Sequence, residues 1–323
     1  MREAPEQVPE PALLAIVSRE WDDSVDELEH LPVGFGAHHW AASARGERRL
    51  FVTFDHLEPK RAAADLEAAY AAAADLAAGG LDFVLPCLPA GPGLCTVPCA
   101  DGAVSATRWV DGRTGDGPPA DAAEAIACAT MLSALHAASP PPDIPRWQPM
   151  FTAESFLDGL TRLVATPWSR GPYGEDARRA IEERMSAITS WAGRYEVLTE
   201  RAVLTRDSWV PTHGEPDTGN QLVTGSGQRF LVDWESLKLA PRERDFASLI
   251  RSGLSWATAY EIASADLAMV QIFDTEWRLS EIGEYAAWFH AEHYGTASDA
   301  VAFDGLLQEL GRSDDLACPP GGY

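Results

Sequence analysis

The segment 211–246 constrains the fold of this chain more than any other and reads P-T-H-G-E-P-D-T-G-N-Q-L-V-T-G-S-G-Q-R-F-L-V-D-W-E-S-L-K-L-A-P-R-E-R-D-F. Short apolar runs at 222–223 and 230–232 flank the sequence T-G-S-G-Q, whose two glycines allow the positive φ angles of a hairpin turn. This pattern predicts two strands joined as a β-hairpin. Because a hairpin brings its ends together, we expect the polar side chains on either side of it to converge.

The converging side chains have a chemical meaning. Four of them precede the hairpin and one follows it: His213, Glu215, Asp217 and Asn220, then Asp233. Asn220 and Asp233 offer the hard oxygen ligands that suit Mg²⁺, an ion that keeps waters and binds substrate phosphates. A carboxylate a few residues before the Asn can orient and deprotonate a hydroxyl, which is the layout of kinase phosphoryl transfer.

The same residues carry a resemblance to a known family. H-G-E-P-D-T-G-N at 213–220, followed by L-V-D-W at 231–234, resembles the aminoglycoside phosphotransferase family, whose usual pattern is H-G-D-x-x-x-x-N and then I/V-D-W. W-x-x-x-x-L-A-P-x-E-R-D at 234–245 is similar to the exit segment of the spectinomycin-phosphotransferase-like branch. The similarity is strong over 211–246 and weaker elsewhere.

The resemblance implies an α+β, bilobal protein-kinase-like fold. We expect a small antiparallel-sheet N-lobe at 1–110 and a larger, mainly helical C-lobe at 111–323 that includes the catalytic hairpin 211–235. Amphipathic helical patterns after residue 121 agree with this division. The Pro/Gly cluster at 111–119 reads as the connection between the lobes, or simply as a linker.

The resemblance also implies roles for the segment's side chains. Asn220 and Asp233 would hold Mg²⁺, and His213 belongs to the catalytic motif. The family's catalytic Asp is Glu215 here, one methylene longer, and Asp217 remains a second candidate for the base.

The nucleotide-binding elements are less regular. Gly34 and Gly36 bracket a turn between extended runs, where glycines would let backbone N–H groups approach phosphate. In kinases the third strand, which we expect here at 48–55, carries a Lys that holds the donor phosphates, but the matching position is Thr53, which is not a cation. Lys60 and Arg49 are the two candidate substitutes.

Two further elements of the nucleotide site are expected. The backbone at 109–112, beginning with Trp109 and Val110, is the candidate hinge that hydrogen-bonds the base. The alanine-rich helix at 60–80 carries Asp65 and Glu67, candidates for the acid that pairs with the strand cation. A further strand is predicted at 81–85.

Composition limits the partners. The formal net charge is −24, from 49 acidic and 25 basic residues, which argues against nucleic acid or an anionic membrane and suits a cationic or neutral small molecule. Five cysteines, an odd number, and an acidic, proline-rich start unlike a signal peptide lead us to expect a cytoplasmic protein.

The predicted activity is transfer of the γ-phosphate of ATP or GTP to a hydroxyl of an antibiotic, such as an aminocyclitol, an aminoglycoside, or a peptide or nucleoside antibiotic. A metabolic small-molecule kinase of the choline, homoserine or sugar type is the first alternative. A non-catalytic binding protein with a kinase fold is the second, because Thr53 and Glu215 depart from the family pattern.

Overall fold

The computed structural model describes residues 3–5, 7–34, 36–57, 62–91, 93–115, 119–251 and 265–312. The chain divides into two compact units, one of 1–146 with 210–239 and one of 147–209 with 240–323. The predicted catalytic hairpin therefore packs with the N-terminal sheet. The lobe boundary at 110/111 stays a prediction, because the compact units follow packing and not chain order.

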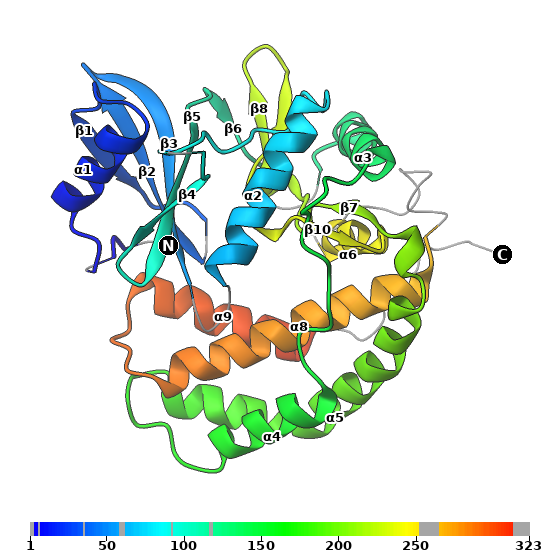
Figure 1. Cartoon of the computed structure of the whole chain (residues 1–323). Coiled ribbons are helices and arrows are strands. Elements are labelled where there is room, and N and C mark those ends of the chain that lie inside the picture. Colours follow the sequence, from blue (N-terminus) through cyan, green and yellow to red (C-terminus); the bar gives the residue numbers. More distant parts are fainter. Residues whose placement is uncertain are drawn as a thin grey trace. The chain divides into compact units, whose positions relative to one another are not determined.

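The first unit is built on a five-stranded antiparallel sheet of order β1-β2-β3-β5-β4. Its strands are β1 (Glu27–Leu31), β2 (Ala37–Ala44), β3 (Glu47–His56), β4 (Thr96–Cys99) and β5 (Gly102–Arg108). Trp40, Val52 and Phe54 share one buried core with Leu13 and Val17 of helix α1 (Glu10–Glu20), which covers this face of the sheet (Figure 1). Because side chains alternate along a strand and Leu50, Val52 and Phe54 lie in the α1 core, Phe51, Thr53 and Asp55 of β3 point to the opposite face.

Helix α2 (Ala63–Ala78) follows β3 and buries Leu66 and Tyr70. Its alanines favour the helix, and Gly79 with Gly80 ends it. The helix packs against η3 (Trp234–Ser236), the short 3₁₀ helix that comes directly after Asp233. The structure therefore places a helix from the N-terminal part beside the residues that follow the β-hairpin at 221–231.

Two small sheets complete the first unit. One is three-stranded, of order β6-β8-β9, and the other pairs β10 with β7. Their strands are β6 (Gly112–Arg113), β7 (Val210–Thr212), β8 (Gln221–Thr224), β9 (Arg229–Leu231) and β10 (Lys238–Ala240). Helix α3 (Ala122–Ala137) follows its N-cap Asp121, whose side chain accepts from the Glu124 N–H. The predicted hairpin is thus confirmed as β8 and β9.

The strand predicted at 81–85 is wrong. The N–H of Leu81 donates to the carbonyl of Leu76, so the chain is still closing helix α2. Only an isolated parallel bridge forms, between Val84 and Leu231. The N–H of Leu231 donates to the Phe83 carbonyl at 2.8 Å, and the N–H of Leu85 donates to the Leu231 carbonyl at 3.2 Å. The apolar run is therefore a lateral support for β9.

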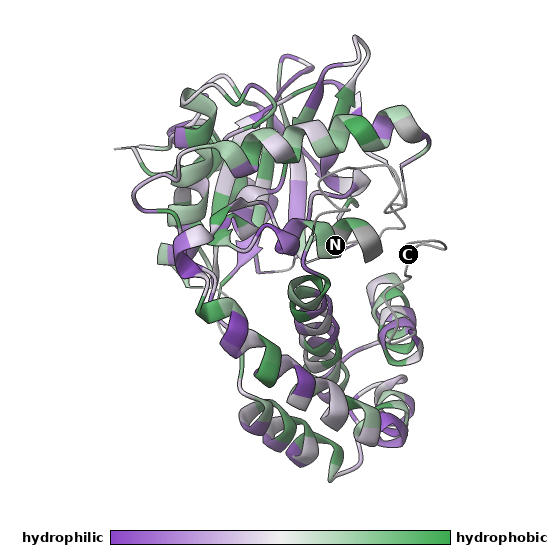
Figure 2. Ribbon diagram, turned by 90° about the vertical axis from the view of Figure 1, so that its right-hand side faces the viewer, coloured by the Kyte–Doolittle hydropathy of each residue, from purple (hydrophilic) through white to green (hydrophobic). Residues whose placement is uncertain are grey.

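The second unit is mainly helical. It contains α4 (Ala153–Val164), α5 (Gly174–Val203), η1 (Arg206–Ser208), α6 (Glu243–Arg251), α8 (Leu267–His290) and α9 (Ala297–Gly311). Hydrophobic and hydrophilic residues are interspersed along its helices (Figure 2). Helix α5 packs on α4, α8 and α9. The helix predicted at 255–270 lies partly outside the described residues. No helix in the described part of the chain is long and apolar enough to cross a membrane.

A buried carboxylate joins three segments of this unit. Glu276 of α8 accepts from Trp147 Nε1 at 2.9 Å and from the hydroxyl of Tyr195 on α5. The same hydroxyl accepts from the Met150 N–H at 3.1 Å. Burial and the Glu276 charge raise the pKa of Tyr195 above its ordinary range, so the phenol keeps its proton and remains a donor.

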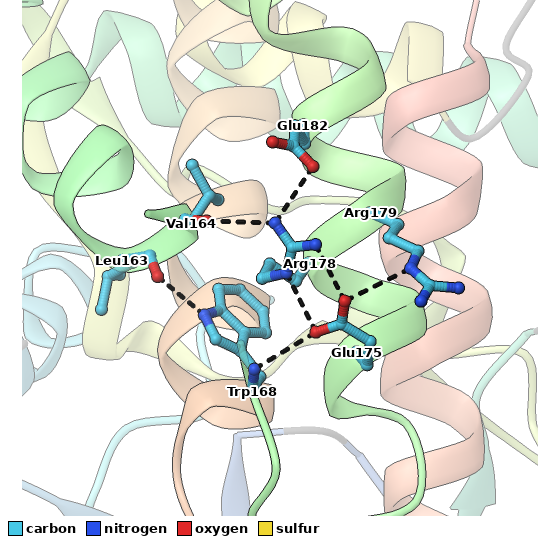
Figure 3. Close-up of polar contacts among 7 residues, drawn as sticks. All are labelled: Leu163, Val164, Trp168, Glu175, Arg178, Arg179 and Glu182. Atoms are coloured by element: carbon cyan, nitrogen blue, oxygen red, sulfur yellow. Dashed lines mark hydrogen bonds and ion pairs between the residues drawn. The ribbon is translucent and has the colours of Figure 1, made fainter. Parts of the chain in front are cut away.

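The junction of α4 and α5 is held by an ion-pair network (Figure 3). The guanidinium of Arg178 binds the Glu175 carboxylate with Nε at 2.9 Å and with a terminal nitrogen at 2.8 Å. Its other terminal nitrogen donates to the carbonyl of Val164, at the end of α4, at 3.1 Å. The Arg178 hydrogen bonds, assisted by the Trp168 N–H, lower the pKa of Glu175 to about 2.

Candidate active site

His213 fixes the loop between β7 and β8 from the inside. Its side chain is fully buried, edge-on to Trp234 with 4.6 Å between ring centroids. Nε2 donates to the Val232 carbonyl at 2.8 Å, and Nδ1 accepts from the Glu215 N–H at 3.3 Å. Both ring nitrogens bind backbone, which assigns the Nε2–H tautomer. The ring ties the start of the loop to the end of β9.

Side-chain amides hold the rest of the loop. Nδ2 of Asn220 donates to the Glu215 carbonyl at 2.9 Å, and Nε2 of Gln221 donates to the Pro216 carbonyl at 2.8 Å. The first bond fixes the Asn220 amide with its nitrogen toward Glu215, so that Oδ1 faces the other side. The oxygen that could bind a cation is therefore oriented by the loop itself.

The two carboxylates that compete for the role of base have different environments. Asp217 caps η2 (Thr218–Asn220), where its carboxylate accepts from the Gly219 N–H at 3.0 Å. Glu215 is half-buried, and its backbone is held at the N–H by His213 and at the carbonyl by Asn220. Asp217 thus has a local structural task, whereas Glu215 is presented on a rigid part of the loop.

Asp233 follows β9 in the left-handed backbone conformation, with φ 67° and ψ 59°. Among residues with a side chain, Asp and Asn tolerate this region best. The Val232 N–H donates to the Asn220 carbonyl at 3.0 Å, so Asn220 and Asp233 lie on opposite sides of the hairpin base. The backbone geometry that the sequence predicted for these two residues is present.

Acidic groups surround Asp233. Its pKa is raised well above the ordinary value by desolvation and by the nearby carboxylates of Glu235, Glu215 and Asp55. Burial of the carboxylate is the largest of these causes, although the residue as a whole keeps exposed surface that a cation can reach. An accessible carboxylate held among other carboxylates attracts a cation, because the cation relieves their repulsion.

Helix α2 contributes Tyr70 to this region, and not the predicted acid. The Tyr70 hydroxyl donates to the Asp55 carboxylate at 3.1 Å. The carboxylate of Glu67 instead accepts from the N–H groups of Cys95 and Thr96, at 2.8 and 2.9 Å. Glu67 therefore anchors the entrance to β4, and Asp65 is exposed. With no Lys at position 53, α2 has no strand cation there to pair with.

The predicted nucleotide turn lies between β1 and β2, directly before the first residue of β2. Gly34 and Gly36 have φ angles of 69° and 102°, which suit glycine. His39 of β2 pairs in register with Thr53 of β3, and its Nδ1 lies 3.1 Å from the threonine hydroxyl. A Cβ built on Gly34 would lie 3.0 Å from His39 Nε2, so this turn, Thr53 and His39 are neighbours.

Of the two predicted substitutes for the missing lysine, the structure describes only Arg49. Arg49 lies four residues before Thr53 on β3, roughly 13 Å along a strand, and its guanidinium pairs with Glu47 at 3.0 Å. It is therefore at the far end of the strand from the glycine turn. Lys60 lies outside the described residues.

The predicted hinge follows β5. The Trp109 N–H donates to the Arg49 carbonyl at 2.8 Å, and the indole donates to the Asp111 carboxylate at 2.8 Å. Val110 is half-buried. Residues 109–111 connect the five-stranded sheet to β6, which pairs with β8, so the candidate hinge joins the sheet with the glycine turn to the sheet that positions Asn220 and Asp233.

Comparison with known proteins agrees with this geometry. A model described as the phosphotransferase enzyme family matches residues 27–298. The chain belongs to the phosphotransferase enzyme family. Protein StrN of Streptomyces griseus is 27% identical over 254 residues, which cover 75% of this chain and 76% of that protein.

Solved structures show the same fold for this member of the phosphotransferase enzyme family. Spectinomycin phosphotransferase APH(9)-Ia, in complex with ADP and spectinomycin, matches with a TM-score of 0.74 and 14% identity over 97% of each chain. A Plasmodium vivax ethanolamine kinase matches with a TM-score of 0.59 and 12% identity, over 92% of this chain and 87% of that one. The predicted family and kinase-like fold are confirmed.

Three residues near the site were not predicted from the sequence: His39, Asp55 and Tyr70. A signal was available for the first, because H-H-W after the glycines places one histidine on each face of the strand. Asp55 and Tyr70 could not be paired without knowing how α2 lies against β3.

Proposed function

We propose that this phosphotransferase moves the γ-phosphate of ATP or GTP to a hydroxyl of an antibiotic. The fold shared with a spectinomycin phosphotransferase bound to ADP and spectinomycin, over 97% of both chains, is the observation that supports this acceptor class best. The convergence of Glu215, Asn220 and Asp233 at one hairpin supports phosphoryl transfer. We place the reaction in the cytoplasm, where nucleoside triphosphates are available.

The donor set fits Mg²⁺. Within the described residues, no three His, Cys, Asp or Glu side chains form a metal site by themselves. Asn220 and Asp233 would hold the ion with one amide and one carboxylate oxygen, and water and phosphate oxygens would complete its shell, as is usual for Mg²⁺. Bound there, the ion neutralises charge on the donor phosphates.

The chain's own residues then divide the work. Glu215 orients the acceptor hydroxyl and takes its proton as the oxygen forms a bond to the γ-phosphorus. The bond from that phosphorus to the β–γ bridging oxygen breaks, and the nucleoside diphosphate leaves. His213 keeps the loop in place through its two backbone hydrogen bonds. The backbone at Trp109 and Val110 would hold the base.

A matched pair of variants tests the base. Glu215→Gln should lower kcat by roughly 10²–10⁴-fold, the usual contribution of a general base, with little change in either KM. Asp217→Asn should keep most of the activity, because an amide oxygen can still accept the Gly219 N–H. Steady-state kinetics on an accepted antibiotic checks both. A normal kcat for Glu215→Gln with a collapse for Asp217→Asn would move the base to Asp217.

The acceptor can be identified with a panel of antibiotics in a resistance assay. Expression in a sensitive host, with one drug from each antibiotic class, should give resistance to at least one drug, and that resistance should be lost with Asp233→Asn. Resistance that survives this variant would contradict phosphoryl transfer as its cause.

A metabolic kinase is the second candidate, because the ethanolamine kinase fold matches over 92% of this chain. Ethanolamine and choline belong in the same assay. Turnover of these amino alcohols without turnover of any antibiotic would select this alternative. Nucleotide binding without turnover of any acceptor would favour a binding protein.

A further inference from the structure

The strand position that holds donor phosphates in kinases carries a neutral threonine in this chain. Kinases place a lysine on the third strand for this contact, and Thr53 of β3 cannot supply a cation. Arg49 is engaged with Glu47 at the other end of the strand. A contact from the described residues to the donor phosphates would therefore come from a side chain other than these two.

His39 lies beside that position on the same face of the sheet. It pairs with Thr53 across β2 and β3. Its ring is stacked on Phe51, with 5.0 Å between centroids and 29° between planes. Phe51 and Thr53 are two residues apart on β3, so both face the side opposite the α1 core. Stacking and strand pairing together fix the ring in one orientation.

In that orientation the two ring nitrogens face different neighbours. Nδ1 lies 3.1 Å from the Thr53 hydroxyl, and Nε2 is the ring atom nearest to a Cβ built on Gly34, at 3.0 Å. When the threonine donates to Nδ1, the proton of the neutral ring is on Nε2. The N–H then points to the glycine turn, where backbone and ligand phosphate can approach closely.

We propose that Nε2–H of His39 donates a hydrogen bond to a phosphate oxygen of the bound nucleotide, and that Thr53 positions the ring for this contact. The proposal rests on the proposed nucleotide-dependent function and names the residue that replaces the strand lysine. Thr53, at the lysine position on β3, is thus a positioning residue. The contact with the phosphate comes from His39 on the neighbouring strand β2.

The electrostatic setting makes His39 a neutral donor. Burial lowers the pKa of His39 to about 4 and His38 acts in the same direction, while the Glu235 carboxylate acts in the opposite direction. At neutral pH the ring therefore supplies one directed N–H and no full charge. The contact selects for a phosphate at one place near the turn, and contributes less to overall attraction than a lysine would.

Two substitutions separate the ring nitrogens. The amide of Gln reaches the place of Nε2, so His39→Gln keeps a donor toward the phosphate. The amide of Asn reaches the place of Nδ1, so His39→Asn keeps a contact with Thr53 and loses that donor. His56→Asn is the control, because this β3 histidine lies on the opposite face and touches Phe54 of the α1 core.

The experiment measures binding of ADP and of adenosine by calorimetry, or of GDP and guanosine if the wild type prefers these. A hydrogen bond to a charged group corresponds to roughly a tenfold to hundredfold change in Kd. His39→Asn should lose about this factor for the diphosphate and nothing for the nucleoside. His39→Gln and His56→Asn should stay within about threefold of the wild type, and Thr53→Val should lose about threefold to tenfold for the diphosphate.

The outcomes separate this inference from the function on which it rests. A wild-type protein that binds neither diphosphate would contradict the proposed function. Wild-type binding with unchanged diphosphate affinity in His39→Asn would overturn the role of His39 alone. Equal losses for diphosphate and nucleoside would also overturn it, because they would report a damaged fold or base site. Thermal melting of each variant shows whether it is folded.

Discussion

At the scale of single residues, Asp233 combines two demands. Its backbone is left-handed, which Asn and Asp accept and alanine accepts poorly. Its carboxylate stands among those of Glu235, Glu215 and Asp55, which raise its pKa together with desolvation. A raised pKa in the folded state means that the ionised form costs stability at neutral pH. If Asp233 binds the cation as proposed, its carboxylate does so at the expense of the stability of the metal-free protein.

Asp233→Asn should separate these effects. Without Mg²⁺ at neutral pH, we expect this variant to melt at a higher temperature than the wild type, because it removes one of the repelling charges and keeps the left-handed residue. The advantage should shrink as the pH falls toward about 4, the ordinary value for Asp, because the wild-type group is then protonated in the folded state. Transfer activity should be lost at every pH. Melting curves across pH, with and without Mg²⁺, test this, and a variant less stable than the wild type at neutral pH would contradict it.

At the scale of elements, carboxylates in the second unit connect neighbouring helices through hydrogen bonds. Glu276 connects α8 to α5 and to Trp147 through buried hydrogen bonds. Glu276→Ala should lower the free energy of unfolding by about 2–6 kcal/mol, because two buried donors lose their acceptor at about 1–3 kcal/mol each. Glu276→Gln keeps one acceptor oxygen and should cost less. Chemical denaturation checks the order, and an equal cost for both would argue against the carboxylate as the connection.

The α4–α5 junction depends on pH in a defined direction. The folded-state pKa of Glu175 is about 2, below the ordinary value of about 4.3. Its contribution to stability is therefore present above about 4.3 and is lost as the pH falls toward 2. Glu175→Gln should be slightly less stable than the wild type at pH 7, and the difference should vanish in acid. A difference that grows in acid would contradict this assignment.

The elements also show what the sequence could predict. The hairpin β8–β9 was predictable because turn glycines and short apolar runs are local signals. The acid partner on α2 was not, because the choice between Glu67 and Tyr70 depends on how the helix is rotated against β3 and β4. The prediction of a strand at 81–85 was wrong for a related reason. An apolar run indicates burial but not strand pairing, and this run forms only a single bridge with β9. Asn220 comes directly before β8, and its carbonyl accepts from the Val232 N–H just after β9. The chemical roles of the site residues stay predictions.

At the scale of the whole molecule, charge is the property that bears on function. A formal net charge of −24 creates a negative potential that attracts cations over about a Debye length. For a cationic antibiotic, KM should rise several-fold between about 0.05 and 0.5 M salt, where screening shortens that length. KM for an uncharged acceptor should change little. Kinetics in a salt series measures both, and equal slopes would show that the charge serves solubility alone.

The bridge between Val84 and Leu231 has a consequence for how the protein comes apart. Strand β9 is hydrogen-bonded to β8 on one side and to residues 83–85 on the other. Freeing Asp233 from its place requires breaking both rows, and with them the connection to the end of α2. Partial melting at the periphery of the first unit would thus leave Asp233 in place, and disorder at Asp233 would accompany unfolding of the whole unit.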